Sequence, residues 1–211
     1  MNTDVSTNSR NFTHHSFYWC FFMGTLLLLA SCSKNPVKVS RVDSLPLTAS
    51  AATLPHTWLI KAKLGIRTAN DSGSVTLDWR QTGTHYVIKV RGPLGQGKAR
   101  ISGNASYIVI EQPGKQPLYS NNPSSLIEET FGWSLPIHDF TFWVRGLANP
   151  DKLIQSVDYA TSGALNSLEQ SGWTLHYSRY QPVNQWLLPG RVRAKQDKSQ
   201  LTLIIREWQL L

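Results

Sequence analysis

Few side chains in this 211-residue sequence could do chemistry, and their spacing does not assemble a catalytic or metal site. The histidines beyond the N-terminal region are His56, His85, His138 and His176, none at the i, i+4 spacing of a helical metal pair and none close to a cysteine. The sequence contains no Gly-x-Ser-x-Gly nucleophile elbow and no Walker-type phosphate loop. We therefore expect a protein that is not an enzyme and that uses no metal or cofactor.

The remaining polar motifs have simpler explanations than catalysis. Glu128 and Glu129 are adjacent, so on a helix they point to different faces and are typical of solvated charges. The stretch from Gly92 to Gly97 reads GPLGQG, which is not the dinucleotide-binding fingerprint and joins two predicted strands instead of opening a helix.

Cys32 carries the clearest chemical signal. The apolar run from Phe17 to Ala30 is short for a membrane span but suits a signal peptide, and Leu29-Ala30-Ser31-Cys32 resembles a bacterial lipobox. The resemblance implies cleavage before Cys32 and lipid on its sulfur and amino group. Because Ser33 stands where inner-membrane retention uses Asp, it also implies an outer-membrane, lipid-anchored protein facing the periplasm. An uncleaved anchor, or a secretory signal with an incidental cysteine, is the alternative.

Charge and cysteine content limit the partners and the fold. Removal of residues 1–31 leaves 180 residues with 20 basic and 12 acidic side chains, enough for one domain of net charge +8. This surplus favours an anionic phospholipid surface or an acidic protein, and an exported lipoprotein meets little nucleic acid. General solubility is the plainer explanation. Since Cys20 leaves with the signal and Cys32 carries lipid, no disulfide is expected.

The chain divides into three predicted parts. Residues 1–31 form the lipoprotein signal peptide, 32–56 a lipidated flexible tether, and 57–211 a single folded domain. The tether is rich in Ser, Thr, Ala and Pro and has no sustained hydrophobic period.

Period-two alternation dominates the folded part. Ile60, Ala62 and Leu64 alternate with Lys61 and Lys63, which gives one apolar and one basic strand face. Similar patterns predict further antiparallel strands around residues 75–80, 86–91, 99–102, 107–110, 165–170, 172–180, 190–196 and 200–210, with 152–158 ambiguous. Two short helices are predicted between them, from Asn122 to Gly132 and from Pro136 to Gly146, because capping residues enclose apolar sets at helical spacing.

This order predicts a mainly β fold with a helical insert. A sheet of this length curls towards a barrel, and helices that cap the curl leave a hydrophobic cavity. The alternation gives the cavity-lining candidates Leu64, Ile66, Leu77, Trp79, Ile88, Phe140, Trp143, Trp173, Leu175 and Leu203. Seven tryptophans follow Cys32, and simple core filling is the alternative for most of them.

The loop Gly92-Pro93-Leu94-Gly95 has an unusual composition. It places a leucine where turn residues are normally polar, with Arg91 before it and Lys98 after it. An exposed leucine flanked by basic residues suits insertion into an anionic membrane, each buried methylene contributing about 0.8 kcal/mol. A leucine folded back onto the sheet is the alternative.

Taken together, the motifs resemble the LolB family of outer-membrane lipoproteins, which receive other lipoproteins from a periplasmic carrier. Behind the lipobox, the motifs are, in order, Trp58 with Leu64-Gly65, Trp79-Arg80-Gln81, Gly92-Pro93-Leu94-Gly95, Gly132-Trp133-Ser134-Leu135-Pro136, Trp143-Val144-Arg145-Gly146-Leu147, Gln170-Ser171-Gly172-Trp173 and Leu188-Pro189. They cover nearly the whole of the chain after the tether.

The resemblance implies an incomplete antiparallel β-barrel, closed by short helices around a hydrophobic cavity that holds acyl chains. It also implies lipid on Cys32 and a protruding loop whose tip leucine, Leu94, assists delivery into the membrane. The expected partners are a LolA-like periplasmic carrier, lipoprotein acyl chains and outer-membrane phospholipid, with no nucleic acid, and the expected state is a monomer. The alternatives are a lipoprotein that binds an apolar ligand without transferring lipoproteins, and a hydrolase built from scattered residues.

Overall fold

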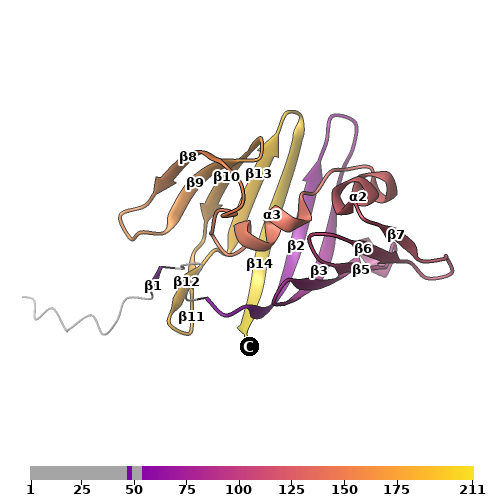
Figure 1. Ribbon diagram of the computed structural model, residues 1–211, viewed down its shortest axis with the longest axis horizontal. Coiled ribbons are helices and arrows are strands. Elements are labelled where there is room, and N and C mark those ends of the chain that lie inside the picture. Colours follow the sequence, from indigo (N-terminus) through magenta and orange to yellow (C-terminus); the bar gives the residue numbers. More distant parts are fainter. Residues whose placement is uncertain (1–46, 49–53) are drawn as a thin grey trace, which may run out of the picture. The chain divides into compact units, whose positions relative to one another are not determined.

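The computed structural model describes residues 47–48 and 54–211 (Figure 1). The predicted signal peptide, Cys32 and most of the predicted tether lie outside the described residues, so the lipobox and lipidation stay predictions. The compact unit that contains the fold spans Ser44–Leu211.

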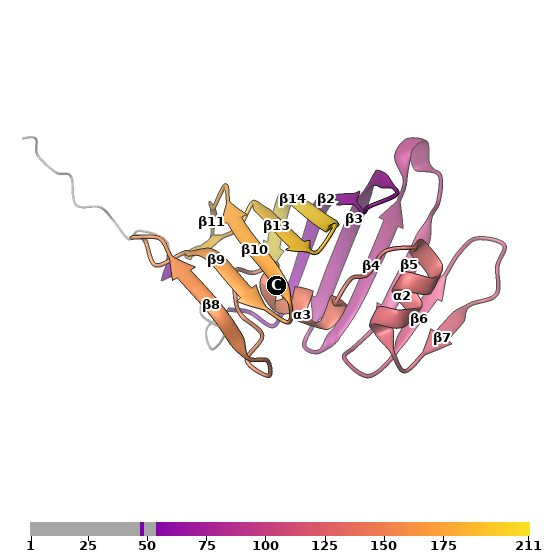
Figure 2. The ribbon, with the colours of Figure 1, turned by 90° about the horizontal axis from the view of Figure 1, so that it is seen from above.

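An antiparallel sheet of eleven strands dominates the described residues, in the order β7-β6-β5-β4-β3-β2-β14-β13-β10-β9-β8. Its strands are β2 (Thr57–Arg67), β3 (Ser72–Thr82), β4 (His85–Arg91), β5 (Ala99–Gly103), β6 (Ile108–Glu111), β7 (Leu118–Ser120), β8 (Ile154–Tyr159), β9 (Leu165–Gln170), β10 (Trp173–Ser178), β13 (Arg191–Gln196) and β14 (Ser199–Leu210). The sheet is strongly curved, and its edge strands β7 and β8 do not pair with each other (Figure 2). The predicted incomplete barrel is therefore confirmed, as an open curled sheet.

A smaller sheet lies beside the C-terminal half of the large one. Strand β12 (Trp186–Leu188) pairs antiparallel with β11 (Gln181–Val183) and parallel with β1 (Leu47–Thr48). The alternation pattern did not predict these short strands. Because β1 and the buried Leu54 fall inside the stretch 32–56 predicted as a tether, the folded unit reaches back into that stretch.

Both predicted helices are present, and both lie on the same face of the sheet (Figures 1 and 2). Helix α2 (Pro123–Phe131) starts where the Asn122 side chain accepts a hydrogen bond from the Ser125 amide at 3.3 Å, and ends at Gly132 with φ 78°. Helix α3 (Ile137–Trp143) ends earlier than predicted, because the chain turns over residues 144–146 and reaches φ 75° at Gly146. The capping residues therefore predicted both ends of α2 closely, whereas they placed the end of α3 too late.

The core lies between the concave face of the sheet and α3. Ile60, Ala62 and Leu64 are at most 4% exposed, whereas Lys61 and Lys63 on the opposite face are exposed, as the alternation predicts. Aromatic rings then fill the concave side, with Trp58 5.4 Å from Trp79 and 5.7 Å from Trp208, and Phe140 of α3 5.3 Å from Trp143. Full burial of each such side chain contributes about 1.5–3 kcal/mol.

A buried amide fixes the helical segment to the sheet. Gln170 at the end of β9 is fully buried, and its side-chain oxygen accepts hydrogen bonds from the Trp143 indole N–H at 2.9 Å and the Asn149 amide at 2.8 Å. Its side-chain nitrogen donates to the carbonyls of Asn149 at 2.9 Å and Lys152 at 3.1 Å. One side chain therefore satisfies four groups on the segment that contains the end of α3 and the loop after it.

We predict that Gln170→Leu lowers the free energy of unfolding by about 2–4 kcal/mol, because a buried polar group left without its partner costs about 1–3 kcal/mol. Urea unfolding at equilibrium measures this loss. The matched control is Gln209→Leu, the same change at an exposed position, which should stay within about 0.5 kcal/mol of the wild type. Equal losses in the two variants would contradict the role given to Gln170.

Candidate functional site

Residues 47–48 and 54–211 contain no group of three or more His, Cys, Asp or Glu side chains placed to hold a metal ion. Across the same residues, no helix is both long enough and apolar enough to cross a membrane.

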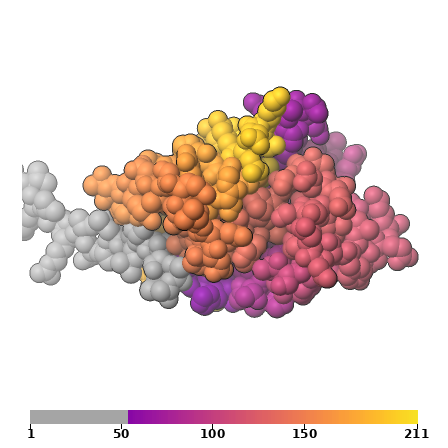
Figure 3. Space-filling view, turned by 45° about the horizontal axis from the view of Figure 1, so that its top comes forward, coloured from indigo at the N-terminus to yellow at the C-terminus, as the bar shows by residue number. Residues whose placement is uncertain are grey.

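An apolar cavity of about 90 Å³ lies between the concave face of the sheet and the helical segment. Six of the ten predicted lining residues surround it, namely Leu64, Leu77, Trp79, Ile88, Phe140 and Leu203. The other residues around it are Val75, Val90, Gly97, Ile101, Phe131, Trp133 and Leu135. Figure 3 shows the helical segment, coloured red, closely packed between neighbouring parts of the molecule.

The four other candidates lie elsewhere. Trp143, Trp173 and Leu175 are buried in the core next to this cavity but not around it, with the Trp143 and Trp173 rings 6.5 Å apart. Ile66 is half-buried and lines a shallow surface groove near Pro93. These four residues were predicted because alternation puts them on the same side of the sheet or helix as the lining residues. Alternation does not show which part of the concave face the helices leave unfilled.

The sequence reasoning missed the residues that close the cavity. Phe131 and Trp133 are half-buried, with their rings stacked 5.9 Å apart, and Leu135 is buried. Their signal was present in the segment Gly132-Trp133-Ser134-Leu135-Pro136, because a short connection between helices seldom contains two large apolar residues.

The cavity lies at the end of the sheet from which the β4–β5 loop extends. Val75 stands near the start of β3, Val90 near the end of β4, and Gly97 shortly before β5, and all three line the cavity. Leu94 lies on the chain between Val90 and Gly97. The loop and the cavity therefore share one rim of the molecule.

Leu94 is held outwards by a tight turn. Residues Pro93–Gly95 form a single 3₁₀ turn, closed by hydrogen bonds from the Gly92 amide to the Gln96 carbonyl at 2.8 Å and from the Gln96 amide to the Pro93 carbonyl at 3.2 Å. A Cβ atom at Gly92 would lie 2.8 Å from that Gln96 oxygen, so glycine is required there. The Leu94 side chain is 99% exposed and is not folded back onto the sheet.

The backbone of Leu94 is strained as well as exposed. Its φ of 56° and ψ of 19° place it in the left-handed region, which costs an L-residue about 1–2 kcal/mol. The fold is thus locally destabilised at the residue whose apolar side chain it exposes to the surroundings. Strain of this kind points to a functional constraint.

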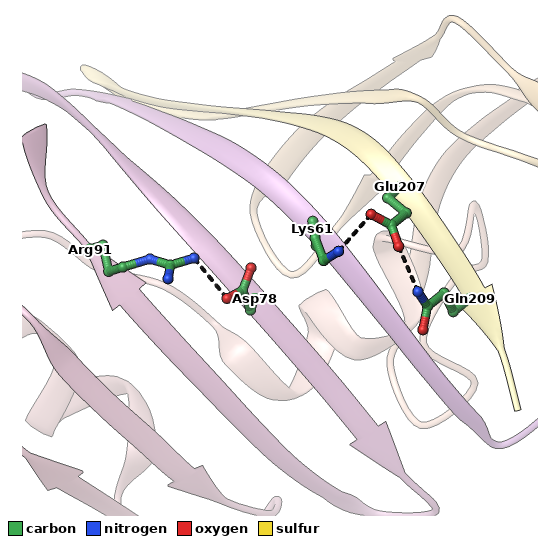
Figure 4. Close-up of polar contacts among 5 residues, drawn as sticks. All are labelled: Lys61, Asp78, Arg91, Glu207 and Gln209. Carbon is green, nitrogen blue, oxygen red and sulfur yellow. Dashed lines mark hydrogen bonds and ion pairs between the residues drawn. The ribbon is translucent and has the colours of Figure 1, made fainter. Parts of the chain in front are cut away.

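Charged side chains cover the outer face of the sheet next to this loop. Arg91 donates to Asp78 at 2.8 Å, and Lys61 donates to Glu207, which also accepts from Gln209 (Figure 4). The hydrogen bond with Glu207 raises the pKa of Lys61, and the same bond lowers the pKa of Glu207. Because the side chains of these pairs keep part of their surface in solvent, such pairs add little stability, and they leave this face charged and accessible.

The comparison with known proteins identifies the family. Residues 56–208 match the family model described as outer membrane lipoprotein LolB. The outer-membrane lipoprotein LolB of Cellvibrio japonicus is 39% identical over 157 residues, which cover 72% of this chain and 77% of that protein. The chain belongs to the LolB family.

A second relative agrees with this assignment, and two solved structures share the fold. LolB of Pseudomonas aeruginosa is 40% identical over 152 residues, covering 72% of this chain and 74% of the relative. Among solved structures, a LolA superfamily protein of Nitrosomonas europaea superposes with a TM-score of 0.50 at 8% identity, over 74% of this chain and 87% of that one. A DUF1329 family protein of Desulfovibrio piger superposes with a TM-score of 0.53 at 9% identity, over 75% of this chain and 87% of that one. These two structures show the shared fold.

We predict that Leu94→Gly leaves the free energy of unfolding of this LolB-family chain unchanged or raises it by up to about 1 kcal/mol, because glycine relieves the left-handed strain. Leu94→Ile keeps the same atoms but adds a β-branch, which the left-handed region tolerates poorly. This variant should lower the free energy of unfolding by about 1 kcal/mol. Thermal and urea unfolding of the pair measure the difference. A glycine variant less stable than the isoleucine variant would show that the side chain packs onto the domain.

Proposed function

We propose that this chain is an outer-membrane lipoprotein receptor. It accepts lipoproteins from a periplasmic LolA-like carrier by binding their acyl chains in the cavity beneath residues 131–140, and inserts them into the outer membrane. Membership of the LolB family supports the class of function, since the relatives are named outer-membrane lipoproteins. The proposal includes lipid on Cys32, which anchors the protein with its domain in the periplasm.

The observation that carries the proposal is the position of Leu94 relative to the cavity. Val90 and Gly97 line the cavity, and the loop between them holds a fully exposed leucine away from the domain. An acyl chain that leaves the cavity at this rim therefore emerges beside the residue that enters the bilayer. A protein that only stored an apolar ligand has no use for this arrangement.

No bond chemistry is needed for such a transfer. Each methylene kept out of water retains about 0.8 kcal/mol, so the transfer from carrier to cavity to bilayer runs towards the environment that buries the acyl chain more completely. Arg91 and Lys98 at the base of the loop are exposed and attract anionic phospholipid headgroups while Leu94 inserts. The receptor acts as a monomer in this proposal, since one domain contains both the cavity and the loop.

The cavity must enlarge to hold cargo. Its volume of about 90 Å³ is well below the roughly 300–1,000 Å³ of ligand pockets. Helix α2 is capped at both ends and α3 is fixed by Gln170, so the connection between them, which contains Trp133 and Leu135 and adjoins Phe131 at the end of α2, is the part placed to move aside. Its two half-buried rings have the least packing to lose.

We expect Leu94→Glu to accept lipoproteins at the wild-type rate but to deliver them to membranes about tenfold more slowly, because a carboxylate does not enter the hydrocarbon layer. The assay follows a labelled lipoprotein from a loaded carrier, through the full-length protein in liposomes, into the bilayer. Gln96→Glu adds the same charge to the same loop away from the tip and should deliver normally. Equal delivery by both variants and the wild type would remove Leu94 from the mechanism.

We expect Val90→Trp to reduce acyl-chain binding about tenfold or more, because the larger ring occupies the cavity rim from a half-buried position. Val87→Trp places the same ring on the opposite face of the same strand and should bind normally. Displacement of a fluorescent fatty acid measures binding in both variants. If wild-type protein binds the fatty acid but takes no lipoprotein from the carrier, the chain is a binding protein and not a receptor.

A further inference from the structure

A second pocket lies under α3 at the opposite end of the sheet from the Leu94 loop. It has a volume of about 360 Å³. Its floor is buried and consists of Trp58, Gln81, Thr141 and Arg145, and its exposed rim includes the β3–β4 turn at Gly83 and Thr84 together with His56 and Ala105. Phe142 and His138 complete the wall from α3.

Aromatic packing separates this pocket from the acyl cavity. Trp58 lines the second pocket and Trp79 lines the first, and their rings lie 5.4 Å apart. The Trp79 indole also donates to the Gln81 side chain at 3.1 Å. The second pocket differs from the first because the polar side chains of Gln81, Thr141 and Arg145 form part of its lining.

Arg145 is the unusual member of this pocket. Its side chain is only 9% exposed, its Nε atom donates to the Thr141 carbonyl at 3.0 Å, and its guanidinium lies 5.6 Å from the centre of the Phe142 ring. Among the described residues, no hydrogen bond or ion pair involves its two terminal nitrogens. Their N–H donors are therefore free to bind something in the pocket.

The surrounding protein does not compensate this charge. The nearby buried carboxylate on α3, Asp139, accepts a hydrogen bond from Asn149 and does not line the pocket. Burial lowers the pKa of Arg145 to about 10, without an opposing effect from an acidic neighbour. The Trp58 indole N–H is likewise buried without a hydrogen-bond partner in the described structure.

The distance between this pocket and the Leu94 loop determines which anions can reach it. The seven residues of β4 separate its rim from the base of the Leu94 loop, which is roughly 20 Å at about 3.3 Å per residue. A bilayer headgroup layer is only about 5–7 Å thick on each side. With Leu94 inserted and β4 running along the membrane normal, lipid phosphates therefore lie out of reach, and the pocket faces soluble partners.

We propose that the Arg145 pocket is a docking site for a carboxylate side chain of an acidic soluble protein. The two free terminal nitrogens form the fork that a carboxylate accepts in a bidentate manner, and the net charge of +8 guides an acidic surface towards it. Under the proposed function, on which this assignment of the partner rests, that protein is the loaded lipoprotein carrier.

The test uses Arg145→Gln in the full-length protein on liposomes, with the purified carrier. We expect the carrier's dissociation constant to rise about 30-fold, the usual consequence of removing one member of a buried charge pair, with partial rescue by Arg145→Lys. Arg80→Gln removes an exposed charge from the outer face and should change it less than about threefold. Fatty-acid binding should be unchanged, and the melting temperature unchanged or higher, since a buried charge without a partner is removed.

Two outcomes would overturn the proposal. If wild type and Arg145→Gln bind the carrier equally while the wild type accepts lipoproteins, the docking site is wrong and the receptor function stands. If Arg145→Gln also loses fatty-acid binding and melts at a lower temperature, Arg145 is a structural residue.

A further probe keeps the docking site testable if the receptor function itself fails. A hexaglutamate peptide is titrated into the wild-type protein while the NMR signal of the Arg145 Nε–H group is followed, with hexaglutamine as the control. A shift with hexaglutamate alone supports a carboxylate site independently of the carrier, and no shift overturns it.

Discussion

The hydrogen bonds of Gln170 are the constraint on which the two pockets depend. A curled sheet with one apolar face needs a cover, and α3 is too short to hold its place by helix propensity alone. Gln170 ties the end of α3 and the following loop to β9, in a place where water cannot compete for the same groups. Phe140 in the cavity wall and Arg145 in the second pocket lie on this segment, so their positions follow from one buried amide.

The fold gives up stability at two points, and these lie at opposite ends of the same sheet. At one end Leu94 combines a left-handed backbone with full exposure, and at the other Arg145 combines burial with an unpaired charge. Neither arrangement helps the chain to fold, and each becomes favourable only with something outside the domain. An apolar environment removes the exposure of the Leu94 side chain to water, and an anion neutralises the buried charge of Arg145. Under the two proposals, the end that contains Leu94 faces the membrane and the end that contains Arg145 faces the aqueous periplasm.

Much of the fold was predictable because it rests on local patterns. Alternation fixed the inner face of β2, and Asn122 with Gly132 fixed both ends of α2. Distant pairing was not predictable in this way, since β1 and β12 join segments far apart in the sequence. The site shows the same division. Alternation identified Leu77 and Ile88 as inward-facing, but the same signal described Leu175, and only the position of the helices decides which of them adjoin the unfilled space.

The small size of the cavity follows from how its parts are held. Strands β2, β3 and β4 are paired along most of their length, so their side of the cavity cannot widen without breaking backbone hydrogen bonds. The opposite side is closed by Phe131 and Trp133, which contact each other and keep part of their surface in solvent. Displacing them exchanges one apolar contact for another once an acyl chain enters, so the free energy of opening is largely recovered by the cargo. In the proposed function, Phe131 and Trp133 close the empty cavity, and burial of an acyl chain offsets the free energy of opening it.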